Sequence, residues 1–120
     1  MAKELLEIAK KAREMFADES TFTVDELAIT RKGKVHRCVL GTILSAIGVD
    51  DFMLLNADIW SVKENITPEQ QMAFFGIIDG LGFEDSCDFA RINNEFGYKD
   101  TLNSFDARLN LWERRLSALN

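Results

Sequence analysis

Apolar residues recur at alternating steps of three and four between Leu102 and Leu119. That spacing places them on one side of an α-helix and leaves polar and charged residues on the other side. It predicts a helix over residues 101–118, with Asp100 or Thr101 as its N-cap. The stripe is too short for a free-standing coiled coil, so this helix must close a core built with other helices. The stripe comprises Leu102, Phe105, Leu109, Trp112, Leu116 and Leu119.

Three earlier segments also have helical character. Residues 2–16 and 36–47 place their apolar residues on one helical side, and Gly48 is positioned as the left-handed residue that ends the second helix. A third helix is expected over about residues 50–60, beginning at either of its two leading aspartates. It contains four consecutive apolar residues, so it should be buried at the centre of the bundle or covered by another chain.

Two more helices are predicted from their capping residues. Residues 67–79 begin with Thr-Pro-Glu-Gln, which combines a capping box with a proline at the first helical position. Gly76 inside this helix indicates close approach of another helix. A short helix over residues 85–93 follows, and Gly97 closes a loop after it.

Residues 17–35 are the least regular part of the chain. Residues 23–26 have the spacing of a capping box and predict one helical turn. The sequence Arg-Lys-Gly-Lys at residues 31–34 is a turn signal, so a small β-hairpin near residues 27–36 is the one β element expected. The predicted fold class is therefore all-α: a compact bundle of five to six helices in a single domain over residues 1–120.

Charge and composition narrow the classes of partner. Twenty acidic and fourteen basic residues give a net charge of −6, which argues against binding to nucleic acid or a polybasic membrane anchor. We expect no membrane span and no secretory signal, and therefore a cytoplasmic protein with two free cysteines. No cofactor motif or metal site is predicted. Acidic clusters at 50–51 and at 84, 85 and 88 do not match a calcium loop, and residues 50–51 and 85–86 are more simply explained as helix caps.

One candidate set for chemistry combines Cys38, His36 and Asn93. A cysteine nucleophile requires a base within hydrogen-bond reach and a third group that orients the base, and these are suitable residue types. However, residues two apart on a helix point in different directions. The competing interpretation makes Cys38 a small buried hydrophobe and His36 an exposed side chain.

A second candidate set consists of large apolar residues on neighbouring helices. They cannot all face one side of their helices, so some are expected to form an exposed patch for a protein partner or a second copy of the chain. The same region could instead enclose a pocket for a small molecule, lined by Phe52, Leu55, Trp60 and Phe75. The predicted partner-binding set is Phe52, Met53, Leu55, Trp60, Phe74 and Phe75.

Two segments carry a family resemblance. The segment from His36 to Leu44 resembles a Cys-x-x-Gly-Ala-Leu helix start. Ile92-Asn93-Asn94, followed by Gly97 and the final helix, resembles a Trp-Asn-Asp-turn-helix ending. Together they resemble an uncharacterised family of small helical proteins from bacteria and their phages. The resemblance covers residues 27–48 and 90–118 and implies a fold without a mechanism. Thr42 replaces the usual Ala, and Asn94 replaces the usual Asp. The asparagine pair is expected to cap or bridge helix ends through bonds to the backbone.

These observations favour a non-enzymatic, acidic interaction module that binds a protein partner or itself. A phage-encoded inhibitor of a host or defence protein is one concrete version. The alternatives are a small cysteine-dependent enzyme that uses Cys38 and His36, and a helical domain that binds a small molecule.

Overall fold

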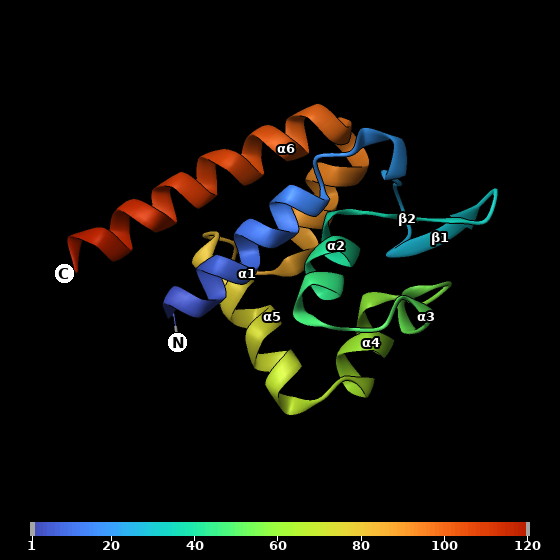
Figure 1. Cartoon of the computed structure of the whole chain (residues 1–120), viewed down its shortest axis with the longest axis horizontal. Coiled ribbons are helices and arrows are strands. Elements are labelled where there is room, and N and C mark those ends of the chain that lie inside the picture. Colours follow the sequence, from blue (N-terminus) through green and yellow to red (C-terminus); the bar gives the residue numbers. More distant parts are fainter. Residues whose placement is uncertain (1, 120) are drawn as a thin grey trace.

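The computed structural model describes residues 2–119, and six α-helices and one two-stranded antiparallel sheet occur in that range (Figure 1). The strands are β1 (Ala28–Arg31) and β2 (Lys34–Arg37), preceded by a short 3-10 helix, η1 (Glu19–Thr21). This confirms the predicted helical bundle with one small β-hairpin. The helices are α1 (Ala2–Met15), α2 (Val39–Ile47), α3 (Asp51–Leu54), α4 (Ile59–Asn65), α5 (Pro68–Gly80) and α6 (Ser86–Ala118).

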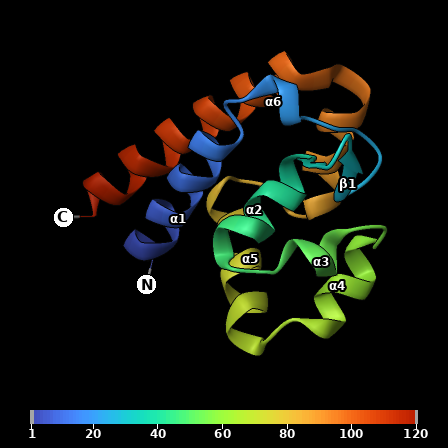
Figure 2. The same cartoon turned by 45° about the vertical axis from the view of Figure 1, so that its right-hand side comes forward.

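The core lies where α1, α2, α5 and α6 meet. In both cartoon views α1 runs beside the C-terminal part of α6 and in the opposite direction (Figures 1 and 2). Gly76 of α5 faces Leu5 of α1, and Gly80 faces the Trp112 ring of α6, each so closely that a Cβ atom would overlap its neighbour. The predicted close approach of another helix at Gly76 is therefore confirmed.

Helix α6 changes direction at Gly97, where φ is +84° and ψ is −171°. Two helical stretches therefore meet at Gly97, which confirms the predicted break there, but residues on both sides are helical, so the predicted multi-residue loop between 93 and 101 is wrong. Thr101 is not an N-cap: it is buried, and its hydroxyl donates to the Gly97 carbonyl oxygen at 2.6 Å. Glycine adopts a positive φ at little cost, so a single residue turns the chain where a loop was expected.

The single helix predicted over residues 50–60 is also wrong. Helix α3 ends after one turn, and Leu55 then forms an isolated β-bridge with Ala28. Asn56 adopts a left-handed conformation with φ of +58°, which asparagine tolerates better than most residues. Asp58 then begins α4 as its N-cap. The four consecutive apolar residues are consequently divided between the interior and the surface.

The hairpin continues further than expected. Ala28 pairs with Arg37, and Lys32 and Gly33 form the turn with φ values of +51° and +75°. Because β2 extends through Arg37, the second helix begins at Val39, and the predicted start at residue 36 is wrong.

The helical turn predicted at residues 23–26 is absent. Thr23 donates its N–H to the Arg37 carbonyl oxygen at 3.2 Å, and Asp25 has a φ of +67°. The segment therefore runs beside the hairpin instead of coiling. Here a long-range backbone bond overrides a local capping pattern.

Two bidentate ion pairs tie distant elements together. Arg13 of α1 donates to both Asp106 carboxylate oxygens of α6 at 2.6 and 3.1 Å. Arg37 of β2 does the same to Asp51 of α3, at 2.9 and 2.5 Å. The second pair holds α3 against the hairpin, and it therefore also positions the exposed side chains of α3, Phe52 and Met53.

Candidate functional site

Cys38 is the N-cap of α2. Its Sγ accepts a hydrogen bond from the Gly41 N–H at 3.4 Å, and only 5 % of the residue is exposed. Burial raises the pKa of Cys38 to about 11. Because the thiolate is the reactive form of cysteine, Cys38 is a protonated, buried thiol at neutral pH.

Asn93 is fully buried on α6, and its side chain makes three hydrogen bonds, two of them to other segments of the chain. Its Oδ1 accepts from the Val39 N–H at 2.9 Å, which caps the start of α2. Its Nδ2 donates to the Thr23 carbonyl oxygen at 3.1 Å and to Asn94 Oδ1 at 3.0 Å. Asn94 Oδ1 also accepts from the Asp25 N–H at 2.8 Å. The expectation that the asparagine pair caps a helix end is confirmed.

The two segments that carry the family resemblance meet at this point. Gly41 lies so close to Leu27 that a Cβ atom would overlap the Leu27 carbonyl oxygen. The same carbonyl accepts from the Cys38 N–H at 3.2 Å. We call Cys38, Gly41, Asn93 and Asn94 the α2 junction. Its residues hold the start of α2 between a loop and α6, which is a structural role for each of them.

The structure does not assemble Cys38, His36 and Asn93 as a catalytic set. His36 lies on β2, and among residues 2–119 no hydrogen bond joins its ring to Cys38 or Asn93. The buried His36 Nδ1 has no hydrogen-bond partner in that range. Asn93 is fully used by the α2 junction, so it is not available to orient a base.

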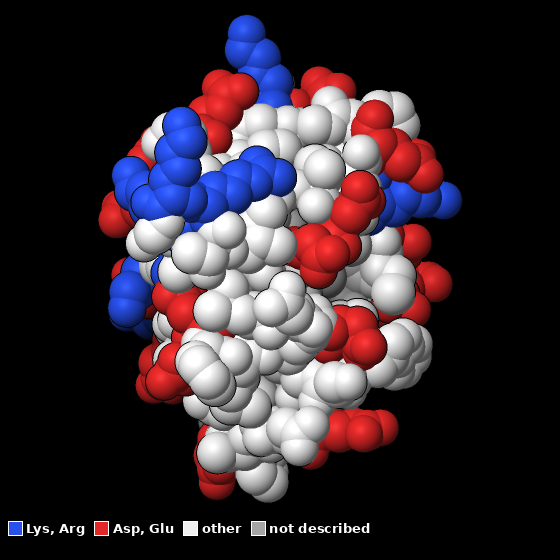
Figure 3. Space-filling model, turned by 90° about the vertical axis from the view of Figure 1, so that its right-hand side faces the viewer, with Lys and Arg blue, Asp and Glu red and all other residues white. Residues whose placement is uncertain are grey.

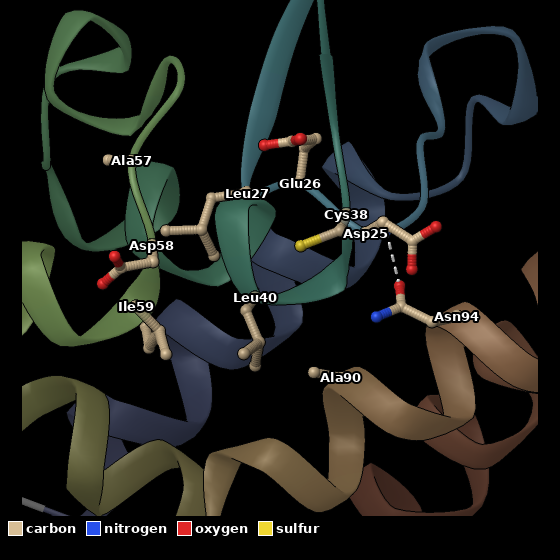
Figure 4. A pocket seen from close by; sticks show the side chains of 10 residues that line it. All are labelled: Asp25, Glu26, Leu27, Cys38, Leu40, Ala57, Asp58, Ile59, Ala90 and Asn94. Carbon is tan, nitrogen blue, oxygen red and sulfur yellow. Dashed lines mark hydrogen bonds between the residues drawn. The ribbon is translucent and has the colours of Figure 1, made fainter.

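A pocket of about 200 Å³ opens beside Cys38 (Figure 4). Figure 4 shows the sulfur pointing inward between Leu27 and Leu40, whereas the carboxylates of Asp25 and Asp58 point away from the centre. Ligand sites for drug-sized molecules usually enclose roughly 300–1,000 Å³ with converging polar groups. This recess is smaller, mainly apolar and without converging groups, so it does not form a built site.

Five large apolar side chains on α3, α4 and α5 are exposed: Phe52, Met53, Trp60, Met72 and Phe75. We call this set of exposed side chains the aromatic face. Helices α3 and α4 lie together at the end of the molecule away from the C-terminal turns of α6 (Figures 1 and 2). The exposed fractions are 84 % for Phe52, 37 % for Met53, 66 % for Trp60, 69 % for Met72 and 49 % for Phe75. Four of these residues were predicted from the sequence, and Met72 was missed.

Two members of the predicted partner-binding set do not belong to this surface. Phe74 is fully buried, because successive residues of a helix point about 100° apart and Phe75 takes the outward position. Leu55 is half-buried and packs on the core. The expected pocket lined by Phe52, Leu55, Trp60 and Phe75 is not formed either, since Phe52 and Trp60 are too exposed to enclose one.

Lys63 links two parts of the aromatic face. Its Nζ lies 4.8 Å from the centre of the Trp60 ring and 5.3 Å from the centre of the Phe75 ring. Cations are attracted to the faces of aromatic rings at such distances. The contact brings α4 and α5 side chains into one surface and shows that this surface accommodates a cationic side chain.

The net negative charge of the chain is concentrated in the segment that carries the aromatic face. Residues 50–88 contain nine acidic side chains and one basic side chain, Lys63, whereas the rest of the chain has eleven acidic and thirteen basic residues. In Figure 3 the lower half, at the height of α3 and α4, is largely uncharged surface with Asp and Glu at its margins, and Lys and Arg gather mainly above it. The sequence alone contains this signal: counting acidic and basic residues segment by segment shows the asymmetry, whereas the net charge of the whole chain hides it.

Comparison with protein-family models, curated proteins and solved structures gives no match to this chain. Residues 2–119 contain no group of three or more His, Cys, Asp or Glu residues placed to hold a metal ion. None of the helices in that range is both long enough and apolar enough to cross a bilayer.

Proposed function

We propose that this protein is a protein-interaction module that binds its partner through the aromatic face. The observation that supports the proposal is the exposure of Phe52, Trp60 and Phe75 on three consecutive helices. Covering a large apolar side chain contributes about 2 kcal/mol, so three such residues in one interface are a substantial source of affinity. Tryptophan and other aromatic residues are also enriched at the centres of protein interfaces.

The charge of the face favours a different protein over a symmetrical pair of copies. In a two-fold symmetrical dimer the same surface meets itself, so the acidic segments of both copies would be brought together. Like charges placed opposite each other oppose association. A partner with basic groups at its margin avoids this repulsion and gains attraction instead.

The compartment and the biological setting are part of the same proposal. Cys38 and Cys87 are both free thiols, which suits the reducing cytoplasm. The resemblance at the α2 junction suggests a bacterial or phage protein, and an inhibitor of a host or defence protein is one form that such a module takes.

Site-specific photo-crosslinking in the native host tests the proposal. A benzoylphenylalanine side chain is introduced at position 52, 60 or 75, one at a time, and adducts are identified by mass spectrometry. Phe96 is the matched control, because it is 60 % exposed but lies on α6 outside the aromatic face. We expect one protein to be captured at all three face positions and not at position 96. Equal capture at position 96, or none at the face, would contradict the proposal.

A further inference from the structure

A pocket of about 350 Å³ lies at the edge of the aromatic face, between the end of α5 and the start of α6. Phe75 belongs to both the face and the pocket. Three acidic residues, Asp79, Glu84 and Asp85, line the pocket, and Phe83 contributes an aromatic wall. We call it the carboxylate pocket. The charged residues that line it are these three acidic side chains and one basic side chain, Lys63, which also contacts the aromatic face.

Ser86 provides an independent sign of an unfilled polar contact. It lines the carboxylate pocket and is only 3 % exposed, yet its Oγ has no hydrogen-bond partner among residues 2–119. A buried hydroxyl without a partner is unfavourable, and native proteins rarely leave one unexplained. A donor group entering the pocket would supply the missing bond.

Two cations of the chain itself already use the aromatic walls. The Arg108 guanidinium carbon lies 3.8 Å from the centre of the Phe83 ring, and Lys63 lies over Phe75. The hydrogen bond from the Cys87 N–H lowers the pKa of Asp85, and the nearby Lys63 charge lowers it further, so this carboxylate is ionised at neutral pH. Phe83 is also stacked on Phe89, with ring centres 4.6 Å apart, so both of its faces are covered, and Phe75 is the exposed ring of the pocket against which a further cation can lie.

We propose that the carboxylate pocket receives an arginine side chain of the partner that docks on the aromatic face. The inference rests on the proposed function and adds the chemistry that the partner must carry. Arginine fits better than lysine, because a planar guanidinium can lie flat on the exposed Phe75 ring and presents several donors in one plane. A guanidinium can donate hydrogen bonds to a carboxylate and to the Ser86 hydroxyl at the same time. The compact ammonium of lysine spans the two acceptors less well.

The matching partner surface has apolar groups for Phe52 and Trp60 and a basic residue at its edge. Helices form the aromatic face, and the nearby strand β1 is already paired with β2 and bridged to Leu55. The exposed side chains of the aromatic face lie on α3, α4 and α5, so this face offers an extended peptide no strand to pair with, and recognition there must come from side chains. An amphipathic helix with an arginine beside its apolar side meets these requirements.

Binding of a synthetic peptide tests the inference. The probe is an amphipathic helical peptide with leucines on one side and arginines beside them. Its match replaces each arginine by citrulline, which keeps the shape and removes the charge. We expect the citrulline peptide to bind at least about tenfold more weakly, because a charge-assisted bond is lost. Amide chemical shifts should place the arginine peptide at Ser86 and Phe83.

Variants of the protein separate the pocket from general acidity. Glu84→Gln and Asp79→Asn should each weaken binding of the arginine peptide several-fold, whereas Asp100→Asn, an exposed acidic site on α6, should not. Lys63→Gln removes the cation that lies over the Phe75 ring and should strengthen binding. Each variant is also checked for an unchanged unfolding midpoint. Equal effects of Glu84→Gln and Asp100→Asn, or no gain from Lys63→Gln, would overturn the inference.

The two proposals fail in different ways. If crosslinking captures a protein at positions 52, 60 and 75 but the pocket variants have no effect, the arginine assignment is overturned and the interaction module stands. If N-acetylarginine amide binds the pocket but no protein is captured, the pocket accepts a free guanidinium compound. That result overturns both the interaction module and the assignment to a partner's side chain.

Discussion

The α2 junction and the aromatic face each differ from what their residue types suggest: the junction has residue types of an active site, and the aromatic face has residue types of a core. The junction contains a cysteine and two asparagines, which are common in active sites, yet its thiol is buried and its Asn93 amide is fully hydrogen-bonded to the chain. The aromatic face contains Phe52 and Trp60, which are typical of a core, yet both lie mostly in solvent. Residue type therefore does not separate the two regions: hydrogen bonding and burial make the junction structural, and exposure makes the aromatic face available to solvent.

The largest effect should separate two adjacent phenylalanines. Phe74→Ala empties a fully buried site and should lower the free energy of unfolding by about 4 kcal/mol. Phe75→Ala, at a half-exposed site on the aromatic face, should cost less than about 1 kcal/mol. Urea unfolding followed by circular dichroism measures both. Similar losses for the two variants would mean that Phe75 belongs to the core and not to the face.

The next effect tests whether Asn93 is structural. Asn93→Ala leaves the Val39 N–H and the Thr23 carbonyl oxygen buried without this partner and should cost about 3 kcal/mol. Asn94 is exposed, so Asn94→Ala should cost only about 1 kcal/mol. The same urea experiment measures both losses. A stable Asn93→Ala protein that has lost partner binding would instead place Asn93 in a functional site.

Thiol chemistry gives a third test of the α2 junction. With the pKa of Cys38 near 11 instead of its ordinary 9, the thiolate fraction at pH 7.5 falls about a hundredfold. Iodoacetamide should therefore label Cys38 at least about a hundredfold more slowly in the native Cys87→Ser variant than in urea. Because the pKa is raised, labelling of the native thiol should keep rising with pH until about pH 11. Native labelling as fast as in urea would revive the nucleophile hypothesis.

The smallest effect compares two helical glycines. Gly41→Ala forces a methyl group against the Leu27 carbonyl oxygen and should cost about 2 kcal/mol, because the backbone must move. Gly76→Ala meets only the terminal methyl group of Leu5, and the gain of about 1 kcal/mol in helix propensity should offset that contact. Melting temperatures of the two variants measure the difference. Equal melting temperatures would show that the backbone at Leu27 moves away from the new methyl group as easily as the Leu5 side chain does.

The sequence by itself determined most helix starts and ends. Asp50, Thr67 and Asp85 cap helices where their local patterns predict, and Gly48 ends α2 with a φ of +108°. The helical apolar spacing also predicted α1 and the buried side of the last helix. These features depend on residues within one or two turns of each other, so a single stretch of sequence contains the information.

Only the tertiary structure decided where the chain breaks and what its side chains face. Helix α3 ends at Leu54, where Leu55 turns to bridge a distant strand, and Asn93 caps α2 from another helix. Neither contact leaves a periodic trace in the sequence, since the partners are tens of residues apart. Burial follows the same logic: neighbouring Phe74 and Phe75 are chemically identical, and the packing of α5 on the core places one inside and the other in solvent.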